Sequence, residues 1–287
     1  MSKYILFFTI IFNIFSETLI LASFNTLHLG WDGKNYHDTA EILSLFDIIA
    51  LQEVMKKEGL TNLVKELESV SHEKWSYHLS PYAAGNGEKY NEYYAFIFKD
   101  KKVKFVKSIG FYPEKNNEFI REPYGAMFKS NKFDFILVNN HLLFGDEKSD
   151  RQKEAKELSK VYSYFQNLDT KENDVFLLGD FNLPAYDESF KDLFKHKDKI
   201  FYSIDPSYKT TIGKSSLANS YDNIFYSFNY SKEYTGRNGV YNYTDDYLKK
   251  YKAQKLNKDI YATYSTKMAN CWLIVDNEFD NNLISSK

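Results

Sequence analysis

The chain has 287 residues, of which 43% are hydrophobic and 26% charged, and its formal net charge is −2. This balance is typical of a soluble globular protein, and the absence of a linker favours one large layered domain. A net charge near zero excludes nucleic-acid binding by a uniformly basic surface, so such a substrate would require a local basic patch or bound metal ions. The single cysteine, Cys271, excludes an intramolecular disulfide and a cysteine-based zinc cluster.

Residues 1–16 have the pattern of a secretory signal peptide. Lys3 is followed by a mostly apolar run over residues 4–15, which is too short to span a bilayer. We expect cleavage after Ser16, a secreted or periplasmic location, and a mature domain over residues 17–280. A buried first strand or an uncleaved anchor is the alternative interpretation.

Short apolar runs alternate with helical patterns along the rest of the chain. Strands are predicted over residues 18–24, 47–52, 93–98, 103–109, 133–139, 174–178, 222–228 and 271–275. The runs 93–98 and 103–109 are expected to pair as a hairpin around Asp100. Helices are predicted over residues 55–70 and 151–168, where apolar residues recur at helical spacing. The Tyr/Lys-rich residues 229–267 have no clear period and are expected to form an irregular insertion.

This order of elements predicts an α/β (α+β) fold. Strands separated by helices favour parallel pairing and hairpins favour antiparallel pairing, so we expect mixed sheets. The number of strands exceeds what one open sheet usually carries. We therefore expect two packed mixed sheets covered by helices, which is a four-layer α/β/β/α sandwich.

Four of the predicted buried strands end in polar side chains suited to metal or phosphate chemistry. Asp180 and Asn182 follow one strand, and Glu53, Asn25 and His141 follow three others. Turn formation could explain Asp180 and Asn182 alone, but it does not explain four such strand ends. One glutamate with amide and aspartate oxygens is a ligand set that suits Mg²⁺.

The remaining histidines show no metal-binding motif. His28, His37 and His78 are scattered without the spacing of a ligand pair, which argues against a soft-metal site. His72 and His196 lie in charged, helix-like surroundings and are expected to be solvated surface residues.

The ordered set of motifs resembles the endonuclease/exonuclease/phosphatase superfamily, and most of all its DNase I-like branch. The motifs are Asn25, Leu51-Gln-Glu53, Tyr90-Asn-Glu-Tyr-Tyr94, Arg121-Glu-Pro123, Asn140-His141, Gly179-Asp-Phe-Asn182 and Ser220-Tyr-Asp-Asn-Ile224. They span residues 20–226. The resemblance implies a DNase I-like fold and a divalent-metal-dependent phosphodiesterase, most directly an endonuclease that hydrolyses DNA.

The resemblance also implies roles for the metal and acid–base residues. Glu53 and Asn25 would bind the metal, which is expected to be Mg²⁺, with Ca²⁺ or Mn²⁺ as alternatives. Glu92 would pair with His141 and raise its pKa, so that the imidazolium acts on the scissile phosphate or the leaving oxygen. A solvated charge at a strand edge is the alternative for Glu92.

Further roles concern the substrate. Arg121 and Asn182 would bind a phosphate, and Asp180 together with Asn182 would orient the attacking water and the developing phosphorane. Asp222 would orient a second histidine. A surface ion pair with Glu118 or Glu122 is the alternative for Arg121.

The closing Ser-Asp-His motif of the family is missing. In an alignment without gaps, Ala269, Asn270 and Cys271 stand in its place, and the last histidine of the chain is His196. Loss of one acid–base partner would cost about 10²- to 10⁴-fold in rate. Cys271 would be a poor substitute, because the unperturbed pKa of a thiol is about 8.5.

Three functions therefore stay open. The first is a secreted DNase I-like endonuclease impaired by loss of the C-terminal Asp-His pair. The second is a phosphatase or a sphingomyelinase-like phosphodiesterase on the same fold. The third is a catalytically retired binding protein that uses the Tyr/Lys-rich segment as its contact face. We expect a monomer without a transmembrane segment.

Overall fold

The computed structural model describes residues 18–87, 91–168, 174–212, 217–243 and 270–276. The predicted signal peptide (residues 1–16) lies outside the described residues, as does Ala269. Among the described residues, no helix is long and apolar enough to cross a membrane.

One sheet has the strand order β11-β12-β1-β2-β4-β3. Its strands are β1 (Thr18–Leu29), β2 (Ile48–Val54), β3 (Trp75–Leu79), β4 (Tyr93–Lys99), β11 (Tyr234–Tyr241) and β12 (Asn270–Asp276). β1 and β2 pair in parallel, and the other pairs are antiparallel. The helices α1 (Tyr36–Leu43) and α2 (Lys57–Ser71) pack on the outer face of this sheet.

The other sheet has the order β5-β6-β7-β8-β10-β9. Its strands are β5 (Lys104–Phe111), β6 (Tyr124–Ser130), β7 (Phe133–His141), β8 (Val175–Asp180), β9 (Ile200–Tyr202) and β10 (Asp222–Ser227). β7 and β8 are parallel and are joined through α3 (Lys148–Leu168). The 3₁₀-helix η1 (Glu188–Phe190) and α4 (Lys191–Phe194) pack with α3 on the outer face.

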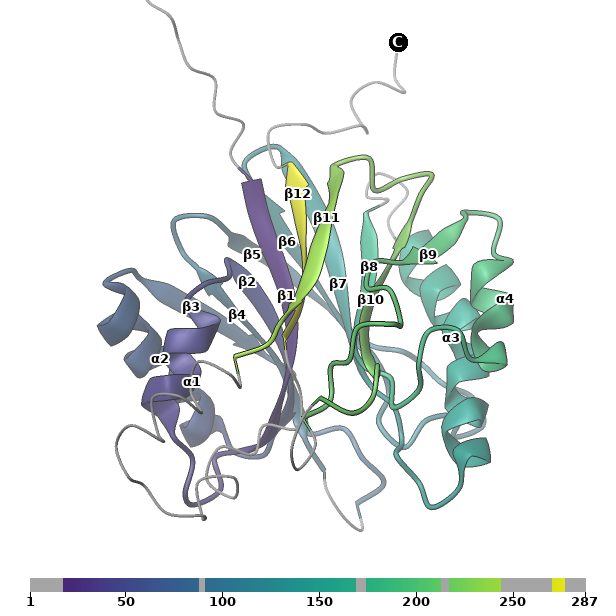
Figure 1. The fold of residues 1–287 in the computed structure, drawn as a ribbon, viewed down its shortest axis with the longest axis horizontal. Coiled ribbons are helices and arrows are strands. Elements are labelled where there is room, and N and C mark those ends of the chain that lie inside the picture. The colour runs from purple at the N-terminus through teal and green to yellow at the C-terminus, as the bar shows by residue number, and fades with distance from the viewer. Residues whose placement is uncertain (1–17, 88–90, 169–173, 213–216, 244–269, 277–287) are drawn as a thin grey trace, which may run out of the picture.

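Three apolar cores hold these layers together. The two sheets face each other across a core rich in aromatic side chains, including Phe96, Phe128 and Phe176. A second core lies between α3 and its sheet, and a third lies between α2 and the other sheet. Figure 1 shows the resulting order of helix, sheet, sheet and helix. The predicted four-layer α/β/β/α sandwich of two mixed sheets is therefore confirmed.

Two predictions about local structure were wrong. The segments 93–98 and 103–109 do not form a hairpin, because β4 and β5 belong to different sheets. Both edges of β4 are already occupied by β2 and β3, so the turn after Asp100 carries the chain across to the second sheet. Residues 234–241, expected to be irregular, form β11, which pairs with β12 at the edge of its sheet.

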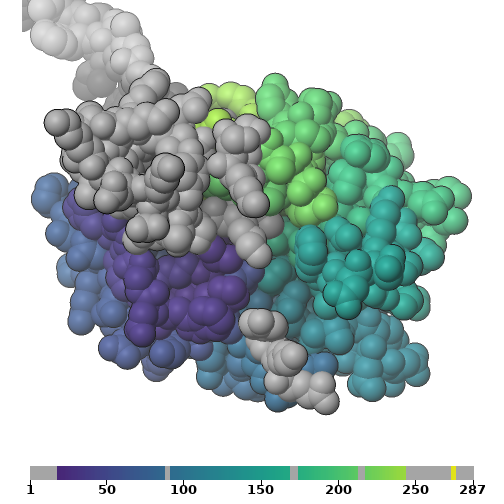
Figure 2. Space-filling model, turned by 60° about the horizontal axis from the view of Figure 1, so that its bottom comes forward, coloured from purple at the N-terminus to yellow at the C-terminus, as the bar shows by residue number. Residues whose placement is uncertain are grey.

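The carboxyl ends of the two parallel strand pairs meet at one edge of the sandwich, the lower edge in Figure 1. Hydrogen bonds join the two sheets there: Asn25 of β1 contacts Asp180 of β8, and Gln52 of β2 donates to Asn139 of β7 at 2.7 Å. Figure 2 turns this edge toward the viewer, with the purple N-terminal elements beside the teal part of the chain. The fold therefore gathers the polar strand ends in one place.

Candidate active site

A buried amide connects two carboxylates at the centre of this edge. Asn25 Nδ2 donates to Glu53 Oε1 at 2.9 Å and to Asp180 Oδ2 at 3.2 Å, and Asn25 Oδ1 accepts from the backbone N–H of Leu27 at 2.9 Å. The amide therefore presents its donor to the carboxylates while its oxygen is held by the backbone. In this arrangement Asn25 positions the Glu53 carboxylate, and its role as a metal ligand stays a prediction.

Glu92 and His141 form the predicted pair. His141 Nδ1 lies 2.8 and 2.9 Å from the two carboxylate oxygens of Glu92, and His141 Nε2 lies 3.6 Å from Asp180 Oδ2. Burial and the nearby Arg121 oppose protonation of His141, but the charge and hydrogen bonds of Glu92, with Asp180, outweigh them and raise its pKa. Burial likewise opposes ionisation of Glu92, yet its contacts with His141 and Arg121 lower its pKa. Both shifts therefore favour the imidazolium–carboxylate form of the pair.

Arg121 contacts both Glu92 and the backbone of His141. Its Nε and Nη2 donate to the carbonyl oxygens of His141 and Leu142, each at 3.1 Å, and Nε lies 3.7 Å from Glu92 Oε2. Arg121 is 8% exposed and faces Glu92. The alternative of a surface ion pair is therefore wrong, and the guanidinium is a fixed positive charge at the base of the site.

Asp180 is the last residue of β8, and Asn182 follows two positions later. The backbone N–H of Asn182 donates to Asp180 Oδ1 at 3.0 Å, and Asn182 Nδ2 donates to the carbonyl oxygen of Leu142 at 2.8 Å. Burial raises the pKa of Asp180, although His141, Asn182 and Asn25 partly offset it. Gly179 precedes Asp180 with φ +148, and a Cβ there would lie 1.9 Å from the carbonyl oxygen of Asn140. Only glycine therefore allows β8 to approach β7 this closely beneath the site.

The backbone is strained at the same strand ends. Glu53 (φ 59), Asn182 (φ 52), Leu27 (φ 45) and His28 (φ 62) all adopt left-handed conformations without being glycine. Such conformations cost on the order of 1–3 kcal/mol each and cluster at functional sites. The strain therefore marks the same place as the side-chain chemistry.

His28 is a site residue that sequence reasoning missed. Its Nε2 lies 3.3 Å from Glu53 Oε2, its backbone N–H donates to the same oxygen at 3.0 Å, and its ring stacks on Trp31 with centroids 4.0 Å apart. The available signal was its position three residues after Asn25 at the end of the same strand. The prediction weighed histidine spacing along the sequence, which says nothing about contacts across the sheet.

The side chains surround a pocket of about 410 Å³. Glu53, Glu92, Arg121, His141 and His28 line it, together with the loop of Leu143, Phe144, Gly145 and Asp146 and with Met55. No group of three His, Cys, Asp or Glu side chains arranged to hold a metal occurs within the described ranges. A cation here would therefore take one carboxylate from Glu53 and complete its shell with water and substrate oxygens, an arrangement that Mg²⁺ accepts.

Asp222 stands beside this cluster but lacks the predicted partner. It is directly opposite Asp180 in the β8–β10 ladder and is 1% exposed. Neither of its carboxylate oxygens has a hydrogen-bond partner in the described part of the chain. Burial and the neighbouring Asp180 raise its pKa well above the ordinary value. The backbone of Cys271, which stands where the family histidine would be, pairs with Ser23 of β1.

Two further histidines lie away from the site. His72 is exposed, as predicted. The prediction for His196 was wrong, because its side chain is only 11% exposed, with Nε2 2.9 Å from Ser163 Oγ and Nδ1 3.4 Å from Asp198 Oδ2. The contact with Ser163 connects the segment after α4 to α3, so His196 has a structural role.

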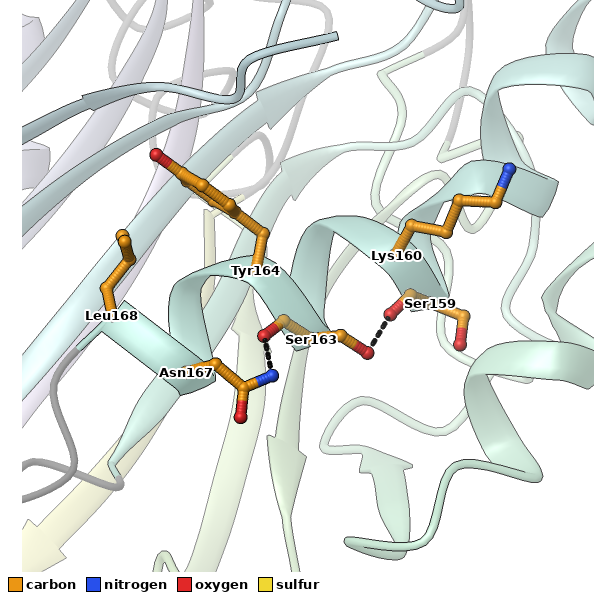
Figure 3. Close-up of a pocket in the computed structure, with 6 residues that line it drawn as sticks. All are labelled: Ser159, Lys160, Ser163, Tyr164, Asn167 and Leu168. Atoms are coloured by element: carbon orange, nitrogen blue, oxygen red, sulfur yellow. Dashed lines mark hydrogen bonds between the residues drawn. The ribbon is translucent and has the colours of Figure 1, made fainter. Parts of the chain in front are cut away.

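A second hollow of about 460 Å³ lies along α3 and is lined by Ser159, Lys160, Ser163, Tyr164, Asn167 and Leu168. Figure 3 shows these side chains on consecutive turns of one helix, with Ser163 bonded to the Ser159 carbonyl and Asn167 bonded to the Ser163 carbonyl. None of the predicted site residues lines it. Four of the predicted site residues instead line the smaller pocket at the strand ends.

Known proteins are similar to this chain in sequence and in fold. No family model matches the chain. It is 35% identical over 176 residues to a deoxyribonuclease of Thioalkalivibrio sp. (strain K90mix), a match that covers 60% of this chain and 48% of that protein. It is 27% identical over 224 residues to deoxyribonuclease gamma of Rattus norvegicus, covering 72% of this chain and 70% of that protein. The chain thus spans about half the length of the first relative.

Solved structures have the same fold. An endonuclease/exonuclease/phosphatase family protein from Bacteroides thetaiotaomicron matches with a TM-score of 0.60 and 15% identity, covering 90% of this chain and 98% of that chain. A D. rerio TDP2 complexed with a single-strand DNA product matches with a TM-score of 0.60 and 16% identity, with the same coverage. The mannosyl-6-phosphatase Bt3783 of Bacteroides thetaiotaomicron matches with a TM-score of 0.60 and 16% identity, covering 90% and 99%. The chain therefore has the DNase I-like fold of the endonuclease/exonuclease/phosphatase superfamily and is similar in sequence to deoxyribonucleases.

Proposed function

We propose that this chain is a divalent-metal-dependent phosphodiesterase that hydrolyses DNA. The observation that carries the proposal is the convergence of Glu53, the His141–Glu92 pair and Arg121 on one pocket, with Asp180 adjacent. A carboxylate for a cation, an imidazolium and a guanidinium are complementary to a phosphodiester and to the charge that develops on it. The names of the two sequence relatives support DNA as the substrate.

Glu53 would hold the cation, which we propose to be Mg²⁺. Its carboxylate is fixed by Asn25 and by the backbone of His28, so it is preorganised for a ligand. The cation would supply charge neutralisation at a phosphate oxygen. The described residues fit such an ion, because several carboxylates stand against one guanidinium and one imidazolium and leave the site with an excess of negative charge.

Three other side chains would act on the phosphate and on the attacking water. His141 Nε2, kept protonated by Glu92 on the other ring nitrogen, donates a hydrogen bond to the scissile phosphate or a proton to the leaving oxygen. Asp180 accepts a proton from the attacking water, and its raised pKa makes it a stronger base than an ordinary aspartate. The second amide hydrogen of Asn182 is available for a phosphate oxygen. Breaking the bond between phosphorus and O3′, with the proton going to O3′, would give a 5′-phosphate and a 3′-hydroxyl.

The second half of the acid–base system is incomplete. Asp222 has no imidazole to orient among the described residues, so the rate would fall below that of an enzyme with both histidines, by about 10²- to 10⁴-fold. The intact His141–Glu92 pair favours a slow enzyme over a retired binding protein. Burying the two charges of this pair costs desolvation free energy, and a retired binding protein would have no function that explains this cost.

Export is part of the proposal but rests on residues 1–16 alone. The apolar run after Lys3 supports secretion or a periplasmic location.

The test is a plasmid-nicking assay of the full chain in Mg²⁺ and in EDTA. The wild type is compared with Glu53→Gln and with Glu58→Gln, an exposed control on α2. We expect nicking that requires the metal, 5′-phosphate ends, and a higher Mg²⁺ requirement in Glu53→Gln alone. Absence of nicking at any Mg²⁺ or Mn²⁺ concentration, or equal activity in EDTA, would overturn the proposal.

A further inference from the structure

His28 brings an imidazole to the pocket in which Glu53 would hold the cation. Its Nε2 lies 3.3 Å from Glu53 Oε2, and both side chains line the pocket of about 410 Å³. The His28 side chain is 26% exposed and that of Glu53 is 11% exposed, so ions in solution reach both. None of the roles proposed above for the phosphate or the attacking water uses this imidazole.

An irregularity in the β1–β2 ladder aims His28 at Glu53. Between two neighbouring pairs of this parallel ladder, residues 26–28 of β1 stand opposite Glu53 alone on β2. His28 itself has a left-handed backbone, with φ 62. Extra residues of this kind re-aim side chains and are frequent beside active sites. The local structure of β1 therefore brings an imidazole to the carboxylate of the neighbouring strand.

The turn that carries His28 is held in place by its own contacts. Lys34 Nζ donates to the carbonyl oxygen of Thr26 at 3.0 Å and to that of Leu27. The His28 ring stacks on Trp31, with centroids 4.0 Å apart. A side chain held in this way is preorganised, because little conformational freedom remains to be lost when a ligand binds.

The spacing of the two side-chain atoms fits one shared cation. Bonds from a divalent ion to an imidazole nitrogen or a carboxylate oxygen are about 2.0–2.2 Å long, so two such ligands at neighbouring corners stand about 3 Å apart. His28 Nε2 and Glu53 Oε2 are separated by 3.3 Å. An ion would therefore bind both atoms after only a small adjustment, and water and phosphate oxygens would complete its shell.

A nitrogen ligand changes which ion such a site prefers. Mg²⁺ takes oxygen ligands, whereas imidazole suits first-row transition ions, whose affinities for a given site rise from Mn²⁺ to Co²⁺. The spacing of the histidines along the sequence argued against a ligand pair made of two histidines. Here the partner of the histidine is a glutamate from the adjacent strand, which that spacing does not address.

We infer that His28 is a second ligand of the cation at Glu53, and that this site binds a first-row transition ion, such as Mn²⁺ or Co²⁺, more tightly than Mg²⁺. The inference rests on the proposed function and deepens it, because it names the class of ion and a further ligand. Where Mg²⁺ is in large excess, the same site would hold Mg²⁺ through Glu53 and water.

The test measures metal binding by the full chain without an affinity tag and without DNA. His28→Phe keeps a ring that stacks on Trp31 but removes the nitrogen. His72→Phe makes the same substitution at an exposed position that is also left-handed, with φ 55, so it controls for backbone strain. The electron paramagnetic resonance signal of free Mn²⁺ gives the Kd for Mn²⁺, and displacement of Mn²⁺ gives the Kd for Mg²⁺ and for Co²⁺.

We expect His28→Phe to raise the Kd by at most about twofold for Mg²⁺, by roughly tenfold for Mn²⁺ and by more for Co²⁺, and His72→Phe to change none of them. His28→Asn, which suits the left-handed backbone, should show the same order of ions even if His28→Phe folds poorly. A purely structural role of His28 would weaken the binding of all three ions by one factor. That result, or an unchanged Kd for every ion, would overturn the inference.

A spectroscopic measurement tests the bond itself. Mn²⁺ bound to the wild type should show electron spin-echo modulation from a directly coordinated nitrogen nucleus. His28→Phe should lose this modulation, and His72→Phe should keep it. Absence of the modulation in the wild type would overturn the inference.

Plasmid nicking separates this inference from the proposed function. A wild type that binds Co²⁺ through His28 but nicks DNA in none of the three ions would contradict the proposed function while supporting the ligand. Nicking that depends on Glu53, together with equal Kd changes for the three ions in His28→Phe, would overturn the inference and leave the proposed function intact.

Discussion

Asp222 of β10 stands directly opposite Asp180 of β8, and both carboxyl groups are buried. Opposed residues in an antiparallel ladder have Cβ atoms about 4.5–5.5 Å apart, so two ionised carboxylates there repel each other strongly. Burial and this repulsion raise the pKa of Asp222. Both effects favour the protonated form of Asp222, in the place where the family resemblance implies a carboxylate that orients a histidine.

The first prediction concerns stability. Because the folded pKa of Asp222 is raised, the unfolded chain loses this proton at lower pH than the folded protein, and stability falls as pH rises above the ordinary value of 3.8. Asp222→Asn removes this dependence. The unfolding free energy of Asp222→Asn minus that of the wild type should therefore increase by roughly 1–3 kcal/mol from about pH 4 to about pH 8. Denaturant titrations across this range measure it, with Asp192→Asn on α4 as an exposed control. Parallel pH curves for wild type and Asp222→Asn would contradict the account.

The second prediction concerns the missing acid–base pair. Replacing Asn270 by Asp and Cys271 by His restores the family motif at the start of β12, where the backbone of Cys271 pairs with Ser23. An imidazole that contacts Asp222 would complete the acid–base system and raise the nicking rate by about 10²-fold or more. Measuring initial rates for the double variant and for each single variant separates the contribution of the pair. An unchanged rate in the double variant would show that the missing motif does not limit activity.

The third prediction concerns pH. Glu92 raises the pKa of His141 against the effect of burial, so the imidazolium persists to higher pH than in an ordinary histidine. If the imidazolium is the active form, activity falls as pH rises through this raised pKa. In Glu92→Gln the alkaline limb of kcat/KM should shift to lower pH, because the carboxylate that favours protonation is gone. A pH profile of DNA cleavage measures this, and an identical alkaline limb would exclude His141 as the titrating group.

The fourth prediction concerns Asn25. Asn25→Ala removes the donor that holds Glu53 and Asp180, so the Glu53 carboxylate loses its fixed position. Loss of such a supporting hydrogen bond typically weakens metal affinity by about 10- to 100-fold. Titration of the nicking rate with Mg²⁺ should therefore show a higher half-saturating concentration. No change in this concentration would place the cation elsewhere.

Strong apolar runs made most of the layered fold predictable. β1, β2, β7 and β8 were found because each contains a continuous run of apolar residues. β5 was located but was predicted to pair with β4, because strands that are close in sequence often form a hairpin. This pairing is impossible because both edges of β4 are occupied by β2 and β3. β11 was missed because it is an edge strand of mostly polar and small residues, with no periodic pattern.

The site residues that could be predicted from the apolar runs are those at the ends of strands. Glu53, His141 and Asp180 were identified in this way, and Glu92 and Arg121 came from the ordered motifs of the resemblance. The orientation of the Asn25 amide was not predictable, because it depends on the backbone N–H of Leu27 and on carboxylates from two other strands.

The most direct test of the central claim is the rate of Mg²⁺-dependent plasmid nicking by His141→Gln relative to wild type. Glutamine keeps a hydrogen-bonding side chain but cannot carry the proton. His72→Gln, at an exposed position after α2, controls for loss of any histidine. We predict that His141→Gln lowers the initial rate by about 10²-fold or more while His72→Gln leaves it unchanged. Equal rates for His141→Gln and wild type would contradict the account.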